Sequence, residues 1–157
     1  HSVYVAVVGG SDEDVAAAIW TKKDIGCDMN GNTIVTVYDT TYSEPQPEYE
    51  ITFHRPDPVA IKFAVSILNK TLLPSNVEVL IQEAIISAFS GGDGGERMRI
   101  GGSIYASRFY APVAMAHSSI SLISILIGTA TADAASVDIG IDQVPTVQAS
   151  DITVTLV

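Results

Sequence analysis

The strongest constraint on the fold is a change of hydrophobic period between residues 59 and 89. In VAIKFAVSIL (59–68), apolar residues alternate, which is typical of a strand with one buried face. From Val77 onward, apolar residues recur three and four positions apart, as on one face of a helix. We therefore expect a helix that runs to about Phe89 and lies on a sheet containing 59–68. The expected inward positions are Ile61, Phe63, Val65 and Ile67 on the strand, and Val77, Leu80, Ile81, Ala84, Ile85 and Ala88 on the helix.

Capping residues mark the starts of two helices. Ser75 and Glu78 have the spacing of a capping box, in which the hydroxyl accepts from the N3 amide and the carboxylate reaches back to the cap. Ser11 precedes three acidic residues at 12–14, where the helix dipole favours negative charge. Gly26 suits the end of that first helix. The sequence thus predicts helices that begin after Ser11 and after Ser75.

Alternating or apolar runs separated by turn residues predict the rest of the fold. A third, short helix is expected over about 104–115, with Ser103 as its cap and Pro112 shortening or kinking it. The chain has 157 residues, enough for one domain. We expect an α+β fold: a single domain over 1–157, with a mainly antiparallel sheet of six or seven strands and about three helices packed on it. The expected strands are 3–10, 33–39, 49–54, 59–68, 119–128, 135–141 and 151–157.

The charge balance narrows the class of partner. The formal net charge is −10, and the eight basic residues are scattered along the chain. Because phosphate neutralisation drives duplex binding, we expect no nucleic-acid partner, and the same charge disfavours anionic membranes. Only 17% of residues are charged, which leaves surface that can face other subunits. The uncharged stretch 109–132 contains a proline and four serines, so we expect a buried helix end and strand there rather than a membrane span.

A glycine-rich segment, GGDGGERMRIGG (91–102), is the first candidate for chemistry. Glycine-rich turns that lead into helices cradle phosphates, but a Walker loop needs Lys and then Ser or Thr after its last glycine. Here Glu96 and Arg97 follow Gly95, and Arg97 takes the place of the third glycine of a dinucleotide fingerprint. We expect a turning connector. A small ligand-binding or enzymatic module that uses 91–102 is the alternative.

The run DMNGNT offers a weak calcium pattern. Asp28, Asn30 and Asn32 alternate as at the start of an EF-hand loop, but Gly31 comes at the fourth position instead of the sixth. Asp39 stands where the loop needs a glutamate. A tight turn at Asn30-Gly31 explains the same residues, and we expect no metal.

Nucleophilic catalysis has little support in the sequence. The histidines are His1, His54 and His117, and no serine stands in a nucleophile-elbow motif. Cys27 is the single cysteine, and it follows a helix-stopping glycine instead of starting a helix, where its pKa would be lowered. We expect no catalytic residue, no cofactor and no small-molecule substrate.

The aromatic segment IYASRFYAP (104–112) combines core and surface positions. Tyr105 and Phe109 share a helical face, which favours core packing. Arg108 and Tyr110 fall on another side, and both residue types are enriched at protein interfaces.

Several segments together resemble the C-terminal part of phage baseplate J-like proteins. The most characteristic are GCDMNGN, RIGGSIYASRFYAP and IDQVP, in this order, and the resemblance covers nearly the whole chain. It implies a C-terminal fragment of a longer structural protein of contractile tails. Such proteins join adjacent wedges into a ring around the central hub, and no catalytic residues belong to the family pattern.

The resemblance also implies a place and partners for the chain. It implies location in the virion, at the tail baseplate, after assembly in the cytoplasm of the bacterial host. The implied partners are other baseplate subunits and copies of the chain itself, and a bacteriocin or another contractile injection machine fits equally well. The loop TTYSEPQPEY (40–49) and the glycine-rich segment would be docking or hinge elements. The expected interface residues are Tyr42, Arg108 and Tyr110.

Overall fold

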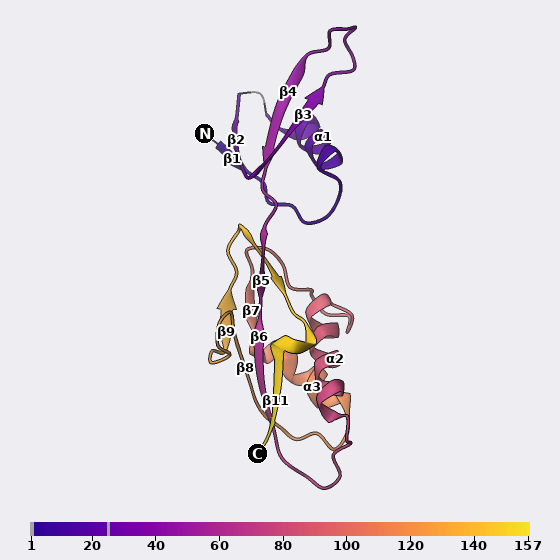
Figure 1. Ribbon diagram of the computed structural model, residues 1–157, viewed down its shortest axis with the longest axis vertical. Helices are drawn as coiled ribbons and strands as arrows, with labels where there is room; N and C mark the ends of the chain where they lie inside the picture. The colour runs from indigo at the N-terminus through magenta and orange to yellow at the C-terminus, as the bar shows by residue number, and fades with distance from the viewer. Residues whose placement is uncertain (1, 25) are drawn as a thin grey trace. The chain divides into compact units, whose positions relative to one another are not determined.

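The computed structural model describes residues 2–24 and 26–157, and shows an α+β protein (Figure 1). These residues form two compact units, His1–Asp57 and Pro58–Val157, and each is described by itself. Two compact units can still unfold together, so a single domain over 1–157 stays a prediction.

Unit 1 is a long β-hairpin with one helix on it. The hairpin pairs its two strands from Thr33 opposite Phe53 to Tyr38 opposite Glu48. Ala16 of the helix packs with Ile51 and Phe53, all fully buried. The elements are β1 (Ser2–Tyr4), α1 (Asp12–Lys22), β2 (Asp28–Asn30), β3 (Thr33–Tyr38) and β4 (Glu48–Phe53).

The start of α1 is as predicted, whereas the strand before it is much shorter. The Ser11 hydroxyl accepts a hydrogen bond from the amide of Asp14 at 3.1 Å, a side-chain cap. The expected buried strand over 3–10 is only three residues long and exposed. Gly9 and Gly10 have positive φ, and their turn ends the extended run.

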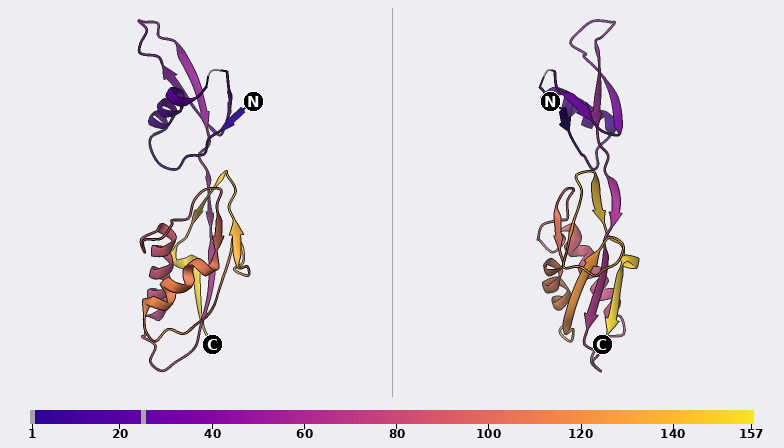
Figure 2. Two further views of the ribbon diagram at one scale, coloured as in Figure 1. Left: turned by 180° about the vertical axis from the view of Figure 1, so that it is seen from behind. Right: turned by 90° about the vertical axis from the view of Figure 1, so that its left-hand side faces the viewer.

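Unit 2 has a three-stranded sheet with helices on one face. The strand order is β11-β6-β8, with β11 parallel and β8 antiparallel to β6. Figures 1 and 2 show α2 and α3 together on one side of this sheet. The helices are α2 (Val77–Ser90) and α3 (Tyr110–Ala116), with 3-10 turns η1 (Ala106–Phe109) and η2 (Ala149–Asp151). The strands are β5 (Asp57–Ala60), β6 (Lys62–Ile67), β7 (Ser103–Tyr105), β8 (Leu122–Gly128), β9 (Ser136–Asp138), β10 (Gln143–Thr146) and β11 (Ile152–Leu156).

The expectation of one antiparallel sheet of six or seven strands is wrong. Within the described residues the strands form four two-stranded sheets and one three-stranded sheet, with parallel and antiparallel pairs. Prolines are one physical reason: Pro58 in β5 and Pro145 in β10 have no N–H to donate to a further strand. Alternation fixes which face of a strand is buried, but it does not fix the partner.

Two predicted helix starts are corrected by the structure. Asn76, not Ser75, is the N-cap of α2, and it makes no side-chain capping bond. The expected helix over 104–115 divides into β7, η1 and α3, because Ser103 donates to Asp138 at 2.6 Å and Ile104 pairs with Val137 of β9.

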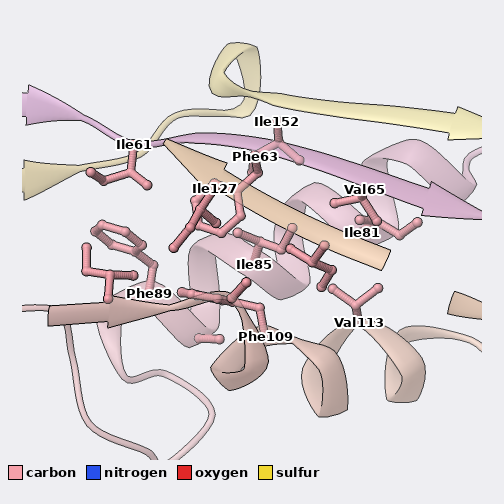
Figure 3. Packing of buried hydrophobic residues seen from close by; sticks show 14 of the residues in the cluster. Ile61, Phe63, Val65, Ile81, Ile85, Phe89, Phe109, Val113, Ile127 and Ile152 are labelled. Carbon is pink, nitrogen blue, oxygen red and sulfur yellow. The ribbon is translucent and has the colours of Figure 1, made fainter. Parts of the chain in front are cut away.

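The core of unit 2 confirms the two hydrophobic periods. Ile61, Phe63, Val65 and Ile67 are at most 1% exposed, and Ile81, Ile85 and Ala88 of α2 are fully buried. Figure 3 shows Ile61, Val65, Ile81 and Ile85 packed between the sheet and the helices, with Phe63, Phe89 and Phe109 among them. The Phe109 ring stands edge-on to Phe63 at 4.9 Å and lies 6.3 Å from Phe89.

Candidate interaction surfaces

The glycine-rich segment is a turn held by internal bonds. Gly91 ends α2 in the left-handed conformation, with φ of 80°. The Met98 amide then returns to the Phe89 carbonyl at 3.0 Å. A side chain on Gly95 would overlap the Arg108 guanidinium, so this glycine permits a close approach. The segment is thereby folded back onto the end of α2.

Arg108 anchors this turn through Asp93. Its two terminal nitrogens donate to the two carboxylate oxygens of Asp93 at 2.7 and 2.6 Å, a bidentate pair. These bonds, and one from the Gly95 amide, lower the pKa of Asp93 from 3.8 to about 2. The ion pair raises the pKa of Arg108 further. Arg108 therefore holds the loop, and its predicted contact with a partner stays a prediction.

Tyr110 lies beside β8, an edge strand of the three-stranded sheet. Its hydroxyl accepts a hydrogen bond from the Ile125 amide at 3.1 Å, and the residue is 39% exposed. A shallow cavity of about 460 Å³ is lined here by Tyr105, Tyr110, Leu126 and neighbours. Exposed aromatic side chains at a strand edge are suited to a protein partner. We call this cavity the β8-edge groove.

Tyr42 lies in the loop between β3 and β4. Asp39 organises this loop: its carboxylate accepts from the Thr41 amide and hydroxyl, and its own amide donates to the Pro47 carbonyl. The Tyr42 side chain is 59% exposed. Tyr42 belongs to unit 1, and the other two expected interface residues, Arg108 and Tyr110, belong to unit 2.

Sequence analysis missed a further surface, the side of the β3–β4 hairpin turned away from α1. Cross-strand register places Ile34 opposite Thr52, Thr36 opposite Glu50 and Tyr38 opposite Glu48 on this side. Ile34 is 65% and Tyr38 54% exposed. We call it the hairpin outer face. The alternation of apolar and polar residues in 33–38 could have predicted this surface. Side chains of a strand point alternately to its two faces, so the residues that are not buried against α1 must lie on the opposite face.

Residues of the calcium-like sequence pattern stabilise the base of the β3–β4 hairpin. Asn32 bonds the Arg55 backbone twice, accepting from its amide at 2.8 Å and donating to its carbonyl at 2.9 Å. A side chain on Gly31 would overlap the Phe53 carbonyl. The Arg55 guanidinium in turn pairs with Asp12 at 2.7 Å and donates to three carbonyls, of Val7, Gly9 and Gly10. These bonds connect the residue pair that follows β4 to the start of α1 and to the loop before it.

The remaining candidates for chemistry also have structural surroundings. His117 bonds Ser119 at 2.7 Å, and the His54 ring lies 5.3 Å from the Tyr4 ring with its Nε2 buried and without a hydrogen-bond partner. Cys27 is a half-buried free thiol, and His1 lies outside the described residues. No group of three or more His, Cys, Asp or Glu side chains arranged for a metal occurs in 2–24 and 26–157. In the same ranges, no helix combines the length and apolar character needed to cross a bilayer.

Comparison with known proteins gives no further assignment. No protein-family model matches the chain, and no curated protein matches it.

Proposed function

We propose that this chain is a structural component of a contractile-tail baseplate, where it makes protein–protein contacts that join wedges into a ring around the hub. The resemblance of RIGGSIYASRFYAP, GCDMNGN and IDQVP to baseplate J-like proteins supports the family. In this proposal the protein has no catalytic activity, and it resides in the virion with other baseplate subunits as partners.

One observation about the described side chains supports the proposal most. Asp93 of the glycine-rich segment is engaged in an ion pair with Arg108, whereas large aromatic side chains stand exposed. Tyr42, Tyr105 and Tyr110 are 59%, 57% and 39% exposed. Tyrosine supplies large contact area with few rotatable bonds, so this distribution suits docking better than turnover.

The test is assembly with the protein's own neighbours. The full-length protein is co-expressed with the adjacent tail gene products, purified through a tag, and imaged by negative-stain electron microscopy. The proposal predicts co-purification and rings. Absence of both partner and ring contradicts it, and a thermal shift induced by inorganic phosphate would favour the ligand-binding alternative at 91–102.

Tyr42→Ala sharpens the test. Because the side chain is largely exposed, the variant should unfold at the wild-type temperature while forming fewer rings. Unchanged ring formation in Tyr42→Ala, Arg108→Ala and Tyr110→Ala proteins would reject these three residues as the interface.

A further inference from the structure

The hairpin outer face combines apolar and acidic side chains. Tyr38 and Glu48 are directly opposite each other, as are Thr36 and Glu50, and both glutamates are exposed. Cβ atoms of such cross-strand pairs are about 5 Å apart, so the ring and the carboxylate form one binding patch. This pairing suits a cation that also stacks on an aromatic ring.

A cavity at the end of the hairpin has the same character. It measures about 680 Å³, is open to solvent, and is lined by the 44–48 segment and Tyr38. Glu44 and Glu48 both contribute to its wall. A guanidinium fits such a site because it can donate two parallel hydrogen bonds to a carboxylate while its plane stacks on a ring.

The acidic charge of this face is not balanced within the described chain. Residues 1–57 hold ten acidic and three basic side chains. Of the three basic side chains, Arg55 forms an ion pair with Asp12, and the Lys23 ammonium donates a hydrogen bond to the Cys27 carbonyl. In residues 2–24 and 26–157, no ion pair or hydrogen bond engages the carboxylates of Glu44, Glu48 or Glu50.

The chain also carries an arginine pair of matching form. Arg97 and Arg99 are exposed, while Met98 between them is half-buried and packs on the core of unit 2. In the described residues neither guanidinium has an ion-pair or hydrogen-bond partner, in contrast to Arg55 and Arg108. Glu96, which directly precedes Arg97 in the chain, is also exposed.

We infer that a second copy of this chain docks its Arg97–Arg99 segment on the hairpin outer face, with the two arginines on Glu48 and Glu50. This inference rests on the proposed function and names one contact that it requires. The spacing matches: Glu48 and Glu50 are two residues apart on one face of β4, about 7 Å, and Arg97 and Arg99 are also two residues apart. The charges are opposite, and the Tyr38 ring lies directly across from Glu48.

The two surfaces differ, so the contact is head-to-tail. Each copy offers one hairpin outer face and one arginine pair, and a heterologous contact of this kind propagates into a ring or a filament. Association is therefore expected to depend on concentration and to weaken with salt, because exposed ion pairs are screened beyond about 10 Å at 0.1 M.

The experiment uses residues 1–157 and two charge-reversed proteins. The acid-reversed protein carries Glu48→Lys and Glu50→Lys, and the arginine-reversed protein carries Arg97→Glu and Arg99→Glu. The control carries Glu78→Lys and Glu83→Lys, which reverse two exposed acids on α2. Weight-average mass is measured by sedimentation equilibrium over a range of concentrations, at low and high salt.

The inference predicts concentration-dependent association of wild type and control. Each reversed protein alone should associate at least about 100-fold more weakly, because like charges opposed at an interface cost several kcal/mol. An equimolar mixture of the two reversed proteins should associate again, since each then presents charges complementary to the other.

Three results would overturn the inference: a wild-type chain that stays monomeric at every concentration and low salt, reversed proteins that associate like the control, or a mixture that does not recover. Failure of the proposed function looks different. A full-length acid-reversed protein that still forms rings with tail proteins rejects this contact alone. Wild-type self-association through these charges, without incorporation into any tail structure, rejects the baseplate role instead.

Discussion

Truncation of Phe109 to alanine is expected to cost a large part of the stability of unit 2. Phe109 is fully buried between α2, α3 and the sheet, with its ring edge-on to Phe63 at 4.9 Å (Figure 3). Removal of a buried phenylalanine costs about 3–5 kcal/mol. Of this, the edge-to-face contact accounts for about 0.5–1.5 kcal/mol. For a unit of this size each kcal/mol lowers Tm by about 4–8 °C, so Tm should fall by about 12–40 °C.

Urea denaturation followed by far-ultraviolet circular dichroism measures this loss. Met115→Ala is the matched control: it lies in α3, is 84% exposed, and should change the free energy of unfolding by less than about 0.5 kcal/mol. A Phe109→Ala protein that loses less than about 1 kcal/mol would refute the packing argument, because no other large side chain replaces the ring at this position.

Three further perturbations test the loop, the hairpin and the β8 edge. Because the folded pKa of Asp93 is about 2 against an ordinary 3.8, its ion pair with Arg108 stabilises the fold above about pH 4 and is lost as pH falls toward 2. In the Asp93→Asn protein, the midpoint of unfolding should therefore depend less steeply on pH between about 4 and 2 than in wild type. An unchanged pH dependence would contradict the lowered pKa of Asp93. Gly31→Ala places a methyl group on the β4 backbone and should destabilise unit 1 by about 1–3 kcal/mol, measured by fluorescence of the single tryptophan; wild-type stability would disprove the close approach. Tyr110→Phe removes the acceptor of the Ile125 amide and should cost about 1 kcal/mol and speed hydrogen exchange at that amide, whereas unaltered exchange would argue against the bond.

Periodicity predicted burial well and strand pairing poorly. The alternation of Ile61, Phe63, Val65 and Ile67 was enough to place all four in the core, because only one face of a strand can be buried against the helices. Nothing in the same pattern indicated that β11 would pair with β6 in parallel, since pairing depends on long-range topology.

Helix-capping motifs led to wrong predictions where the same side chain makes a hydrogen bond to a residue far away in the chain. Ser103 was expected to cap a helix, but its hydroxyl bonds Asp138 of β9, 35 positions away, and the backbone around it is extended. The ion pair between Arg108 and Asp93, which anchors the glycine-rich segment, also could not be predicted from the sequence. The two residues are 15 positions apart, and no sequence motif with this spacing indicates such a pair.

Hydroxyl-radical footprinting of the isolated full-length protein and of the assembled baseplate tests the central claim most directly. It measures the solvent access of individual tyrosines, and Tyr42 and Tyr110 are both exposed in the isolated chain. If the chain acts by contact with other subunits, oxidation of these two residues should fall several-fold on assembly. Equal oxidation of both tyrosines, free and assembled, would contradict that account.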